Sequence, residues 1–230
     1  MRRAWCFKDK LNDTSMKLLA IDRSTEILSA ALSVEGTVHA EEFAGIDARN
    51  ADWPTRISEF IKGHGLEFTD LDRIVVGMGP GSFAGIRGAL SFAQGLAIGI
   101  KAKRAGFADG SIVYGIPSPA ALAQENGLTA VVGDARRGLF WVVVYDGVKT
   151  VSDFRLVEKD GLYEAVPENA PVVTSDSARI GEQLEEIFGD RYRGGGKPSA
   201  GRMAEIAMSN PELLVCEPLP VYLSPAVRQN

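Results

Sequence analysis

Residues 19–22 read Leu-Ala-Ile-Asp and residues 131–134 read Val-Val-Gly-Asp, and both runs lead into a polar turn that contains arginine. Each run has the pattern of a short buried strand that ends at an aspartate. A β segment and a turn glycine follow in both copies: Gly36 comes 14 residues after the first aspartate, and Gly147 comes 13 residues after the second. This weak internal repeat predicts two similar α/β lobes in one chain.

Further strands and helices are expected around each copy. In the first lobe the pattern predicts strands at residues 18–21, 27–34, 38–43 and 74–76, a helix that begins near Asn50 or Asp52, and a helix from Ser82 to about Ile100. In the second lobe it predicts strands at 140–145 and 171–174, helices at 176–188 and 199–208, and a solvent-exposed loop at 191–197. Two such lobes with mixed sheets describe the actin-like (ASKHA, ribonuclease H-like) architecture.

The chain is expected to divide into three parts. Residues 1–15 show no clear period and are expected to be an N-terminal extension. Residues 16–105 form the N-terminal actin-like lobe, and residues 106–230 form the C-terminal actin-like lobe with a C-terminal segment. A length of 230 residues with 45% hydrophobic content is sufficient for a core in each lobe.

Charge and cysteine content limit the function classes. A net charge of −5 argues against a large phosphate-binding surface, so direct, tight RNA binding by the chain alone is not expected. Cys6 and Cys216 are the only cysteines, and they indicate neither a disulfide framework nor a thiolate metal site. Charges at residues 8–10 interrupt any secretory signal, and no membrane span is predicted. A cytoplasmic location is expected.

The two aspartate turns are candidates for nucleotide binding. In the actin-like architecture such turns flank phosphates, with backbone N–H groups and hydroxyls as donors and a carboxylate to hold Mg²⁺. The candidate residues are Asp22, Ser24, Thr25 and Asp134. The alternative is that these side chains bond their own backbone and only form turns. Arg136 and Arg137 present the same choice, because they either neutralise a phosphate or order their loop.

Residues 79–99 read GPGSFAGIRGALSFAQGLAIG and predict a glycine-rich turn followed by a helix that Ser82 caps. The turn lacks the lysine of a Walker A loop, so alone it is a weak nucleotide signal. The helix carries small residues at four-residue spacing from Gly85 to Ala97 and is nonpolar on nearly all sides. We therefore expect it to be buried on nearly all sides, in part by another protein, with intramolecular packing as the alternative.

The predicted partner interface joins this helix to the amphipathic helix before it. Its members are Trp53, Ile57, Ile61, Gly85, Gly88, Ala89, Phe92 and Ala93. For the apolar stripe of Trp53, Ile57 and Ile61, packing on the sheet of the same lobe is the alternative.

Four motifs resemble, in their order and spacing, those of the TsaB (YeaZ) family, which was formerly grouped with M22 glycoprotease-like proteins. They are AIDRST, GPGSFAGIRGALSFAQGLAIG, GDARRGLFW and PLPVYLSP, and the resemblance spans about Lys17 to Pro225. The glycine-rich motif departs from the usual GPGSFTG pattern at Ala84. Where many relatives carry a His-Ser-Glu-like stretch, this chain reads Ala48-Arg49-Asn50, so contacts tied to that histidine are not carried over.

The resemblance implies a noncatalytic accessory subunit that binds and activates TsaD. The process would be formation of threonylcarbamoyladenosine next to the anticodon of tRNAs that read ANN codons. A TsaD-like subunit and a TsaE-like ATPase are the implied partners, and a homodimer is implied for the isolated chain. The isolated chain requires no cofactor under this hypothesis, whereas ATP or ADP with Mg²⁺ belongs to the complex.

Two other functions stay open on the residues alone. One is an actin-fold ATP-dependent phosphotransferase that uses Asp22 and Asp134, and the other is a self-associating scaffold without a TsaD role. A metalloprotease is implausible because His39 and His64 are the only histidines and form no HxxxH pair. No metal site and no catalytic residue are predicted.

Overall fold

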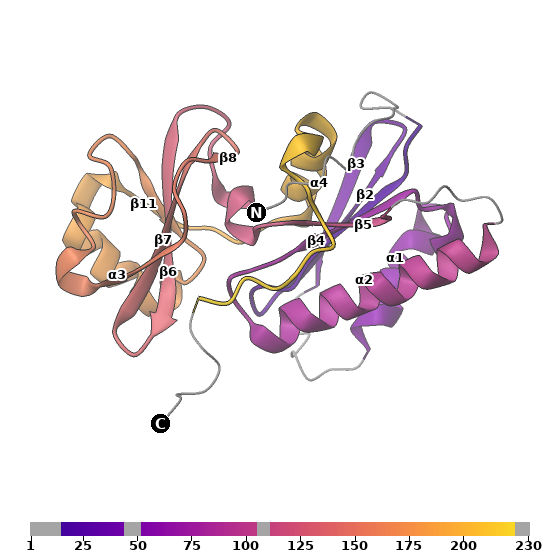
Figure 1. Cartoon of the computed structure of the whole chain (residues 1–230), viewed down its shortest axis with the longest axis horizontal. Coiled ribbons are helices and arrows are strands. Elements are labelled where there is room, and N and C mark those ends of the chain that lie inside the picture. Colours follow the sequence, from indigo (N-terminus) through magenta and orange to yellow (C-terminus); the bar gives the residue numbers. More distant parts are fainter. Residues whose placement is uncertain (1–14, 44–51, 105–110, 224–230) are drawn as a thin grey trace. The chain divides into compact units, whose positions relative to one another are not determined.

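The computed structural model describes residues 15–43, 52–104 and 111–223 of the chain (Figure 1). The chain divides into two compact units, one of Met1–Ser118 with Ser199–Pro220 and one of Pro119–Pro198 with Val221–Asn230. Each unit is an α/β fold with a mixed sheet, which confirms the predicted fold class.

The sheet of the first unit combines an antiparallel meander with parallel strands. Its strands are β1 (Leu18–Asp22), β2 (Leu28–Val34), β3 (Thr37–Phe43), β4 (Arg73–Gly77), β5 (Val113–Ile116) and β12 (Val215–Cys216). Strands β1, β2 and β3 pair antiparallel, whereas β4 runs parallel to β1 and β5 runs parallel to β4. The order is β12-β5-β4-β1-β2-β3, so the carboxyl ends of β1 and β4 lie side by side.

Helices cover both faces of this sheet (Figure 1). Helices α1 (Trp53–Gly63) and α2 (Phe83–Lys103) pack on one face, and α4 (Ala200–Ser209) packs on the other against β1, β2 and β3. Because both faces are covered, every residue of β1 is buried. The core beneath α1 and α2 includes Leu19, Ile21, Leu32, Ile57, Ile74 and Ile86.

The second unit has the same strand plan. Its strands are β6 (Leu128–Arg136), β7 (Leu139–Asp146), β8 (Lys149–Thr150), β9 (Arg155–Glu158), β10 (Val172–Thr174) and β11 (Tyr192–Gly195). The order is β11-β10-β6-β7-β8, with β9 also paired to β7. Helix α3 (Ser177–Phe188) buries Ile180, Leu184 and Phe188 in the core of this unit. Short 3₁₀ helices in the chain are Phe68–Asp70, Ser118–Leu122, Lys159–Gly161, Gly189–Arg191 and Pro211–Leu213.

The internal repeat predicted from the sequence is present in the topology. In each unit the first two strands form an antiparallel hairpin, and a later strand pairs parallel to the first: β1, β2 and β4 correspond to β6, β7 and β10. Helix α2 follows β4 as α3 follows β10. The two units are therefore copies of one supersecondary plan.

The units divide at other residues than the sequence suggested. The break follows Ser118 and not residue 105, because β5 completes the first sheet. The expected lobe at 106–230 also loses α4 and β12, since α4 packs on the first sheet and the Ala200 N–H donates to Ser29 Oγ at 2.9 Å. Residues 191–197, expected as a loop, contain β11, which pairs with β10. The expected extension at 1–15 lies outside the described residues apart from Ser15.

Cys216 in β12 is disulfide-bonded, although the cysteine content indicated no disulfide framework. The only other cysteine of the chain, Cys6, lies outside the described residues. The spacing of cysteines in a sequence does not by itself determine which of them form disulfides.

Candidate functional site

Asp22 is the last residue of β1 and is almost fully buried, with 1% of its surface exposed. Its Oδ1 accepts hydrogen bonds from the Ser24 backbone N–H at 2.9 Å and from the Ser24 hydroxyl at 2.7 Å. Its Oδ2 accepts a hydrogen bond from the Ser118 hydroxyl at 2.6 Å, and Ser118 Oγ accepts one from the Gly79 N–H at 3.0 Å. Both oxygens of the carboxyl group are thus used inside the first unit.

The surroundings of Asp22 control its protonation. Burial raises the pKa of Asp22 above its ordinary value, and the hydrogen bonds from Ser118 and Ser24 oppose that rise. A Cβ on Gly77, at the end of β4, would collide with Asp22 Oδ2. The carboxyl group therefore lies in a space that exists only because β4 ends in glycine.

The glycine-rich turn packs directly against the Asp22 turn. A Cβ on Gly81 would collide with the Ser24 carbonyl oxygen, and a Cβ on Gly85 would collide with the Arg23 carbonyl oxygen. The Ser82 N–H donates to the Ser24 carbonyl at 2.7 Å, and the Ser82 side chain caps α2 by accepting from the Gly85 N–H at 3.2 Å. These contacts pack the AIDRST and GPGSFAG motifs against each other.

Thr25, the third candidate in this turn, contacts its own loop. Its hydroxyl lies 3.4 Å from the Ile27 carbonyl oxygen and accepts the Ile27 N–H at 3.3 Å. Of the four residues predicted to bind nucleotide, the structure therefore brings Asp22 and Ser24 together, and Thr25 forms a turn bond of the kind weighed as the alternative.

Asp134 holds the equivalent position in the second unit, near the end of β6. Its backbone N–H donates to Asp176 Oδ2 at 3.0 Å, and its carboxylate accepts the Arg136 N–H at 2.7 Å. The same carboxylate forms ion pairs with Arg136 at 3.3 Å and Arg179 at 3.5 Å. Arg136 and Arg137 both have positive φ, at 68° and 56°, in the turn before β7. Asp134 is thus paired with Arg136 and Arg179, and it orders the turn of its own hairpin.

Helix α2 is buried on one face only, which corrects the expectation of burial on nearly all sides. By length and composition α2 could cross a membrane, yet it serves here as a covering helix of a β-sheet, with 33% of its nonpolar window buried. Its buried residues are Gly85, Ile86, Ala89, Leu90, Ala93 and Ile100. Because α2 has nonpolar residues on every side, its sequence does not indicate which side packs on the sheet.

Most of the predicted partner residues lie in the core of the first unit. Those with at most 7% exposure are Trp53, Ile57, Ile61, Ala89 and Ala93, and Gly85 is also buried. Of the eight residues, Gly88 and Phe92 keep partial exposure. The buried six pack on their own sheet because α1 and α2 turn these side chains toward β1, β2 and β4.

The opposite side of α2 is unoccupied by the rest of the described chain. We define the open face of α2 as Ala84, Arg87, Ser91, Gly95, Ile98 and Gly99, which are all exposed; Phe83 and Gln94 of the same helix are exposed as well. Ile98 is 72% exposed, and nothing lies within 4 Å of a Cβ built on Gly95 or Gly99. Small and nonpolar side chains on an exposed helix allow another backbone to approach closely.

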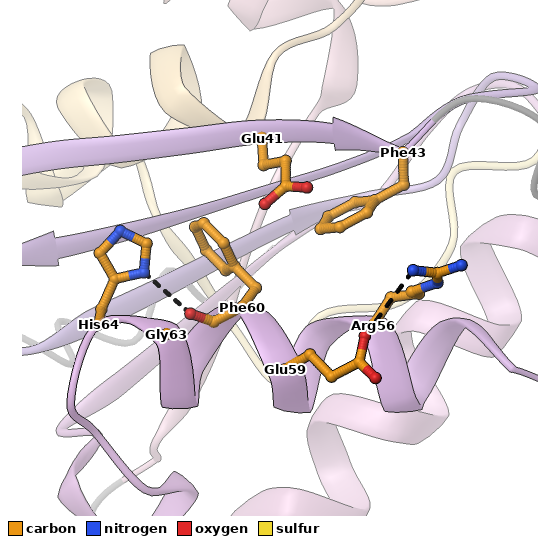
Figure 2. A pocket seen from close by; sticks show the side chains of 7 residues that line it. All are labelled: Glu41, Phe43, Arg56, Glu59, Phe60, Gly63 and His64. Carbon is orange, nitrogen blue, oxygen red and sulfur yellow. Dashed lines mark hydrogen bonds and ion pairs between the residues drawn. The ribbon is translucent and has the colours of Figure 1, made fainter.

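A cleft of about 270 Å³ lies between β3 and α1 (Figure 2). Arg56 forms an ion pair with Glu59 at 3.8 Å, and His64 Nδ1 lies 2.9 Å from the Phe60 carbonyl oxygen. The rings of His39 and His64 are 4.7 Å apart. Within the described ranges, no group of three or more His, Cys, Asp or Glu side chains could hold a metal ion. The lining residues are Glu41, Phe43, Arg56, Glu59, Phe60, Gly63 and His64.

This chain is similar to known proteins in both sequence and fold. Residues 51–156 match the family model described as "TsaD: tRNA N6-adenosine threonylcarbamoyltransferase". The chain is 34% identical over 134 residues to the tRNA threonylcarbamoyladenosine biosynthesis protein TsaB of Escherichia coli (strain K12), a match that covers 55% of this chain and 54% of that protein. A solved structure, YeaZ from Pseudomonas aeruginosa, superposes with a TM-score of 0.69 at 25% identity and covers 90% of this chain and 100% of that one. The chain is therefore similar in sequence to TsaB proteins and in fold to YeaZ.

The matched share of each relative's length differs from one relative to the next. The TsaB protein of Bacillus subtilis (strain 168) is 27% identical over 186 residues, which cover 76% of this chain and 78% of that protein. The match with the Escherichia coli relative, in contrast, spans about half of that protein's length.

Three residues at these sites were not predicted from the sequence. Ser118 contacts Asp22 across 96 positions of the chain, a separation that leaves no local signal. Gly77 did carry a signal, because a glycine in a buried strand marks a close approach of another group. Arg23 was taken as part of a polar turn, yet it is 4% exposed and lies beneath α2.

Proposed function

We propose that this chain is a noncatalytic accessory subunit that binds and activates a TsaD-like subunit during formation of threonylcarbamoyladenosine next to the anticodon of tRNAs that read ANN codons. A TsaE-like ATPase joins the same complex, and the isolated chain forms a homodimer. The chain contacts tRNA through the complex and works in the cytoplasm. It needs no cofactor alone, and ATP or ADP with Mg²⁺ enters with the complex.

The observation that carries this proposal is the open face of α2. A helix of 21 residues with small and nonpolar side chains facing outward exposes surface that soluble monomers ordinarily bury. Gly95 and Gly99 leave open space where a partner helix can approach. Similarity to TsaB proteins and the match to the TsaD family model support a TsaD-like subunit as the protein that covers this face.

The enclosure of Asp22 argues against the alternative of a phosphotransferase. A magnesium-holding carboxylate needs an oxygen directed at the ligand. Both Asp22 oxygens accept hydrogen bonds from Ser24 and Ser118, and burial favours the neutral form of the group by raising its pKa. An enclosed, serine-bound carboxyl group suits a structural role in a noncatalytic subunit.

Association with the TsaD-like subunit of the same organism tests the proposal. A tryptophan at Gly95 projects from the open face and meets no atom of its own chain within 4 Å of the Cβ, so Gly95→Trp is expected to fold. We expect purified wild-type chain to form a complex with this subunit in size-exclusion chromatography, and Gly95→Trp to form none.

The matched control is Ala178→Trp on α3, the counterpart of α2 in the second unit, where Ala178 is also exposed. This variant is expected to bind as the wild type does. Failure of the wild type to associate, or normal association of a folded Gly95→Trp chain, would contradict the proposal. Ala89 and Ala93 are unsuitable positions for this test because both are fully buried.

A further inference from the structure

Arg23 is a buried cation without a charged partner among the described residues. It is 4% exposed, and burial lowers the pKa of its guanidinium. Across residues 15–43, 52–104 and 111–223 it has neither an ion pair nor a side-chain hydrogen bond with a described residue. Buried arginine side chains are ordinarily paired, because an uncompensated charge away from water is strongly destabilising. The guanidinium nitrogens of Arg23 are not among the buried, unpartnered side-chain atoms of the described residues, so they keep contact with solvent and are open to an anion that those residues do not supply.

Two neighbours fix the position of the guanidinium. Its Cζ lies 4.5 Å from the centre of the Trp53 ring, which is a cation–π contact. Its Nη1 lies 3.4 Å from where a Cβ on Gly88 would stand. Gly88 is partly exposed, so the missing side chain of this glycine leaves Nη1 directly beneath the surface of α2.

The position above Gly88 continues the open face of α2. Residues 84, 88, 91, 95 and 98 are separated by four, three, four and three positions, the spacing of one stripe along a helix. A partner oxygen packed against the Gly88 Cα, on the side where a Cβ would project, can approach Arg23 Nη1 in line with Ala84 and Ser91. The partner's backbone would pack against the small residues of the stripe, and one of the partner's side chains would bind Arg23.

Charge indicates which chemistry this side chain has. Helix α2 contains no aspartate or glutamate, and its charged residues are Arg87, Lys101 and Lys103. A second α2 helix would therefore bring further positive charge to the face. A planar carboxylate can accept two parallel hydrogen bonds from a guanidinium, so it suits Arg23 better than a neutral acceptor does.

We propose that Arg23, reached through the gap at Gly88, is the receptor for an aspartate or glutamate side chain of the protein that covers the open face of α2. This inference rests on the proposed function, in which that protein is the TsaD-like subunit. Arg23 is then a specificity-determining residue of the interface, and its counter-charge is a carboxylate that arrives with the partner.

The test compares stability and affinity in the same variants. Arg23→Met keeps an unbranched side chain for packing and removes the charge, so the isolated chain is expected to keep or raise its melting temperature. Its affinity for the TsaD-like subunit, measured by isothermal titration calorimetry, is expected to fall at least about tenfold. Gly88→Ala places a methyl group between the approaching carboxylate and Arg23 and should weaken binding in the same direction.

The matched glycine control is Gly63→Ala at the end of α1, where a Cβ meets nothing within 4 Å. This change is expected to leave the affinity unaltered. Added NaCl should weaken binding of the wild type more than binding of Arg23→Met, because one ion pair is lost in the variant.

Different results overturn the inference and the proposed function. If Arg23→Met and Gly88→Ala bind as the wild type does while Gly95→Trp fails to bind, the carboxylate receptor is wrong and the accessory role stands. A joint fall of melting temperature and affinity in Arg23→Met assigns Arg23 a packing role and overturns the inference. The inference is also overturned if Arg23→Met binds the TsaD-like subunit normally but no longer self-associates, because Arg23 then contacts a second copy of this chain. It is likewise overturned if that variant binds the subunit normally but is no longer stabilised by added sulfate, because Arg23 then binds a free anion. If the wild type binds no TsaD-like subunit, both proposals fail together.

Discussion

The two units place an aspartate at the end of equivalent strands, yet the two carboxyl groups have opposite surroundings. Asp22 is 1% exposed and bonded to the hydroxyls of Ser24 and Ser118. The Asp134 side chain is 16% exposed and paired with the side chains of Arg136 and Arg179. The repeat therefore preserves where the carboxyl group stands in the backbone, while neighbouring side chains determine whether it is a buried hydrogen-bond acceptor or an ion-pair partner.

The neighbouring parallel strand explains much of this difference. In the first unit β4 ends at Gly77, and the absent side chain makes room for the Asp22 carboxyl group. In the second unit β10 ends at Thr174, whose hydroxyl accepts the Asp176 N–H at 3.0 Å. Asp176 in turn accepts the Asp134 backbone N–H, so the carboxyl group of Asp134 turns to the arginines.

The largest effect is expected from filling the space beside Asp22. Gly77→Ala places a methyl group against Asp22 Oδ2 and within 2.7 Å of Ser118 Oγ, and both groups are buried. We expect a loss of about 3 kcal/mol in the free energy of unfolding, measured by urea titration. Thr174→Ala, the corresponding change in the second unit, should cost about 1 kcal/mol because one hydrogen bond is lost. Equal losses in the two variants would contradict the contrast between the units.

A smaller effect should appear in the pH dependence of stability. Burial raises the pKa of Asp22, so the folded chain holds this proton more tightly than the unfolded chain. The contribution of Asp22 is therefore greatest below its ordinary pKa of 3.8 and declines as the pH rises toward the raised value. Asp22→Asn mimics the protonated group. In that window its free energy of unfolding should rise relative to that of the wild type by up to about 1.4 kcal/mol for each pH unit.

Denaturant titrations at several pH values measure this difference. Asp134→Asn at the equivalent position serves as the comparison, and any pH dependence it shares with Asp22→Asn belongs to the chain as a whole. A wild type that gains stability relative to Asp22→Asn as the pH rises would reverse the predicted sign.

The smallest effect is expected at the ion pairs of Asp134. Asp134→Asn removes charge from contacts with Arg136 and Arg179, whose side chains are 63% and 43% exposed. Exposed pairs of this kind contribute about 0–1 kcal/mol, and salt reduces the contribution. Melting temperatures at low and high NaCl concentration should therefore converge for wild type and variant. If Asp134→Asn lost as much free energy of unfolding as Gly77→Ala, the ion pairs of Asp134 would stabilise the second unit more than their exposure indicates.

The sequence predicted the parts of the fold that depend on local pattern. The strands around Asp22 and Asp134 and the bounds of α2 follow from hydrophobic runs, turn glycines and the Ser82 cap. The return of α4 to the first sheet could not be predicted, because it depends on contacts between segments about 170 residues apart, such as Ala200 with Ser29. Strand β11 has two glycines in four residues and exists through pairing with β10.

The candidate sites were predictable to a similar extent. The sequence identified Asp22, Ser24 and α2 as important, and it could not supply Ser118 or the direction in which α2 faces. A helix with nonpolar residues on every side has no amphipathic period, so burial could not be assigned to one side. The predicted partner residues fell on the core side, and the open face lies on the other.

The most direct test of the central claim measures threonylcarbamoyladenosine in tRNA. The reaction contains the TsaD-like subunit and TsaE-like ATPase of the same organism, threonylcarbamoyl adenylate and tRNA, with wild-type chain, Gly95→Trp, Ala178→Trp or no chain. The account predicts that wild type and Ala178→Trp raise product formation and that folded Gly95→Trp gives the amount formed without the chain. Product formation that is unchanged by the wild type, or fully supported by Gly95→Trp, would contradict it.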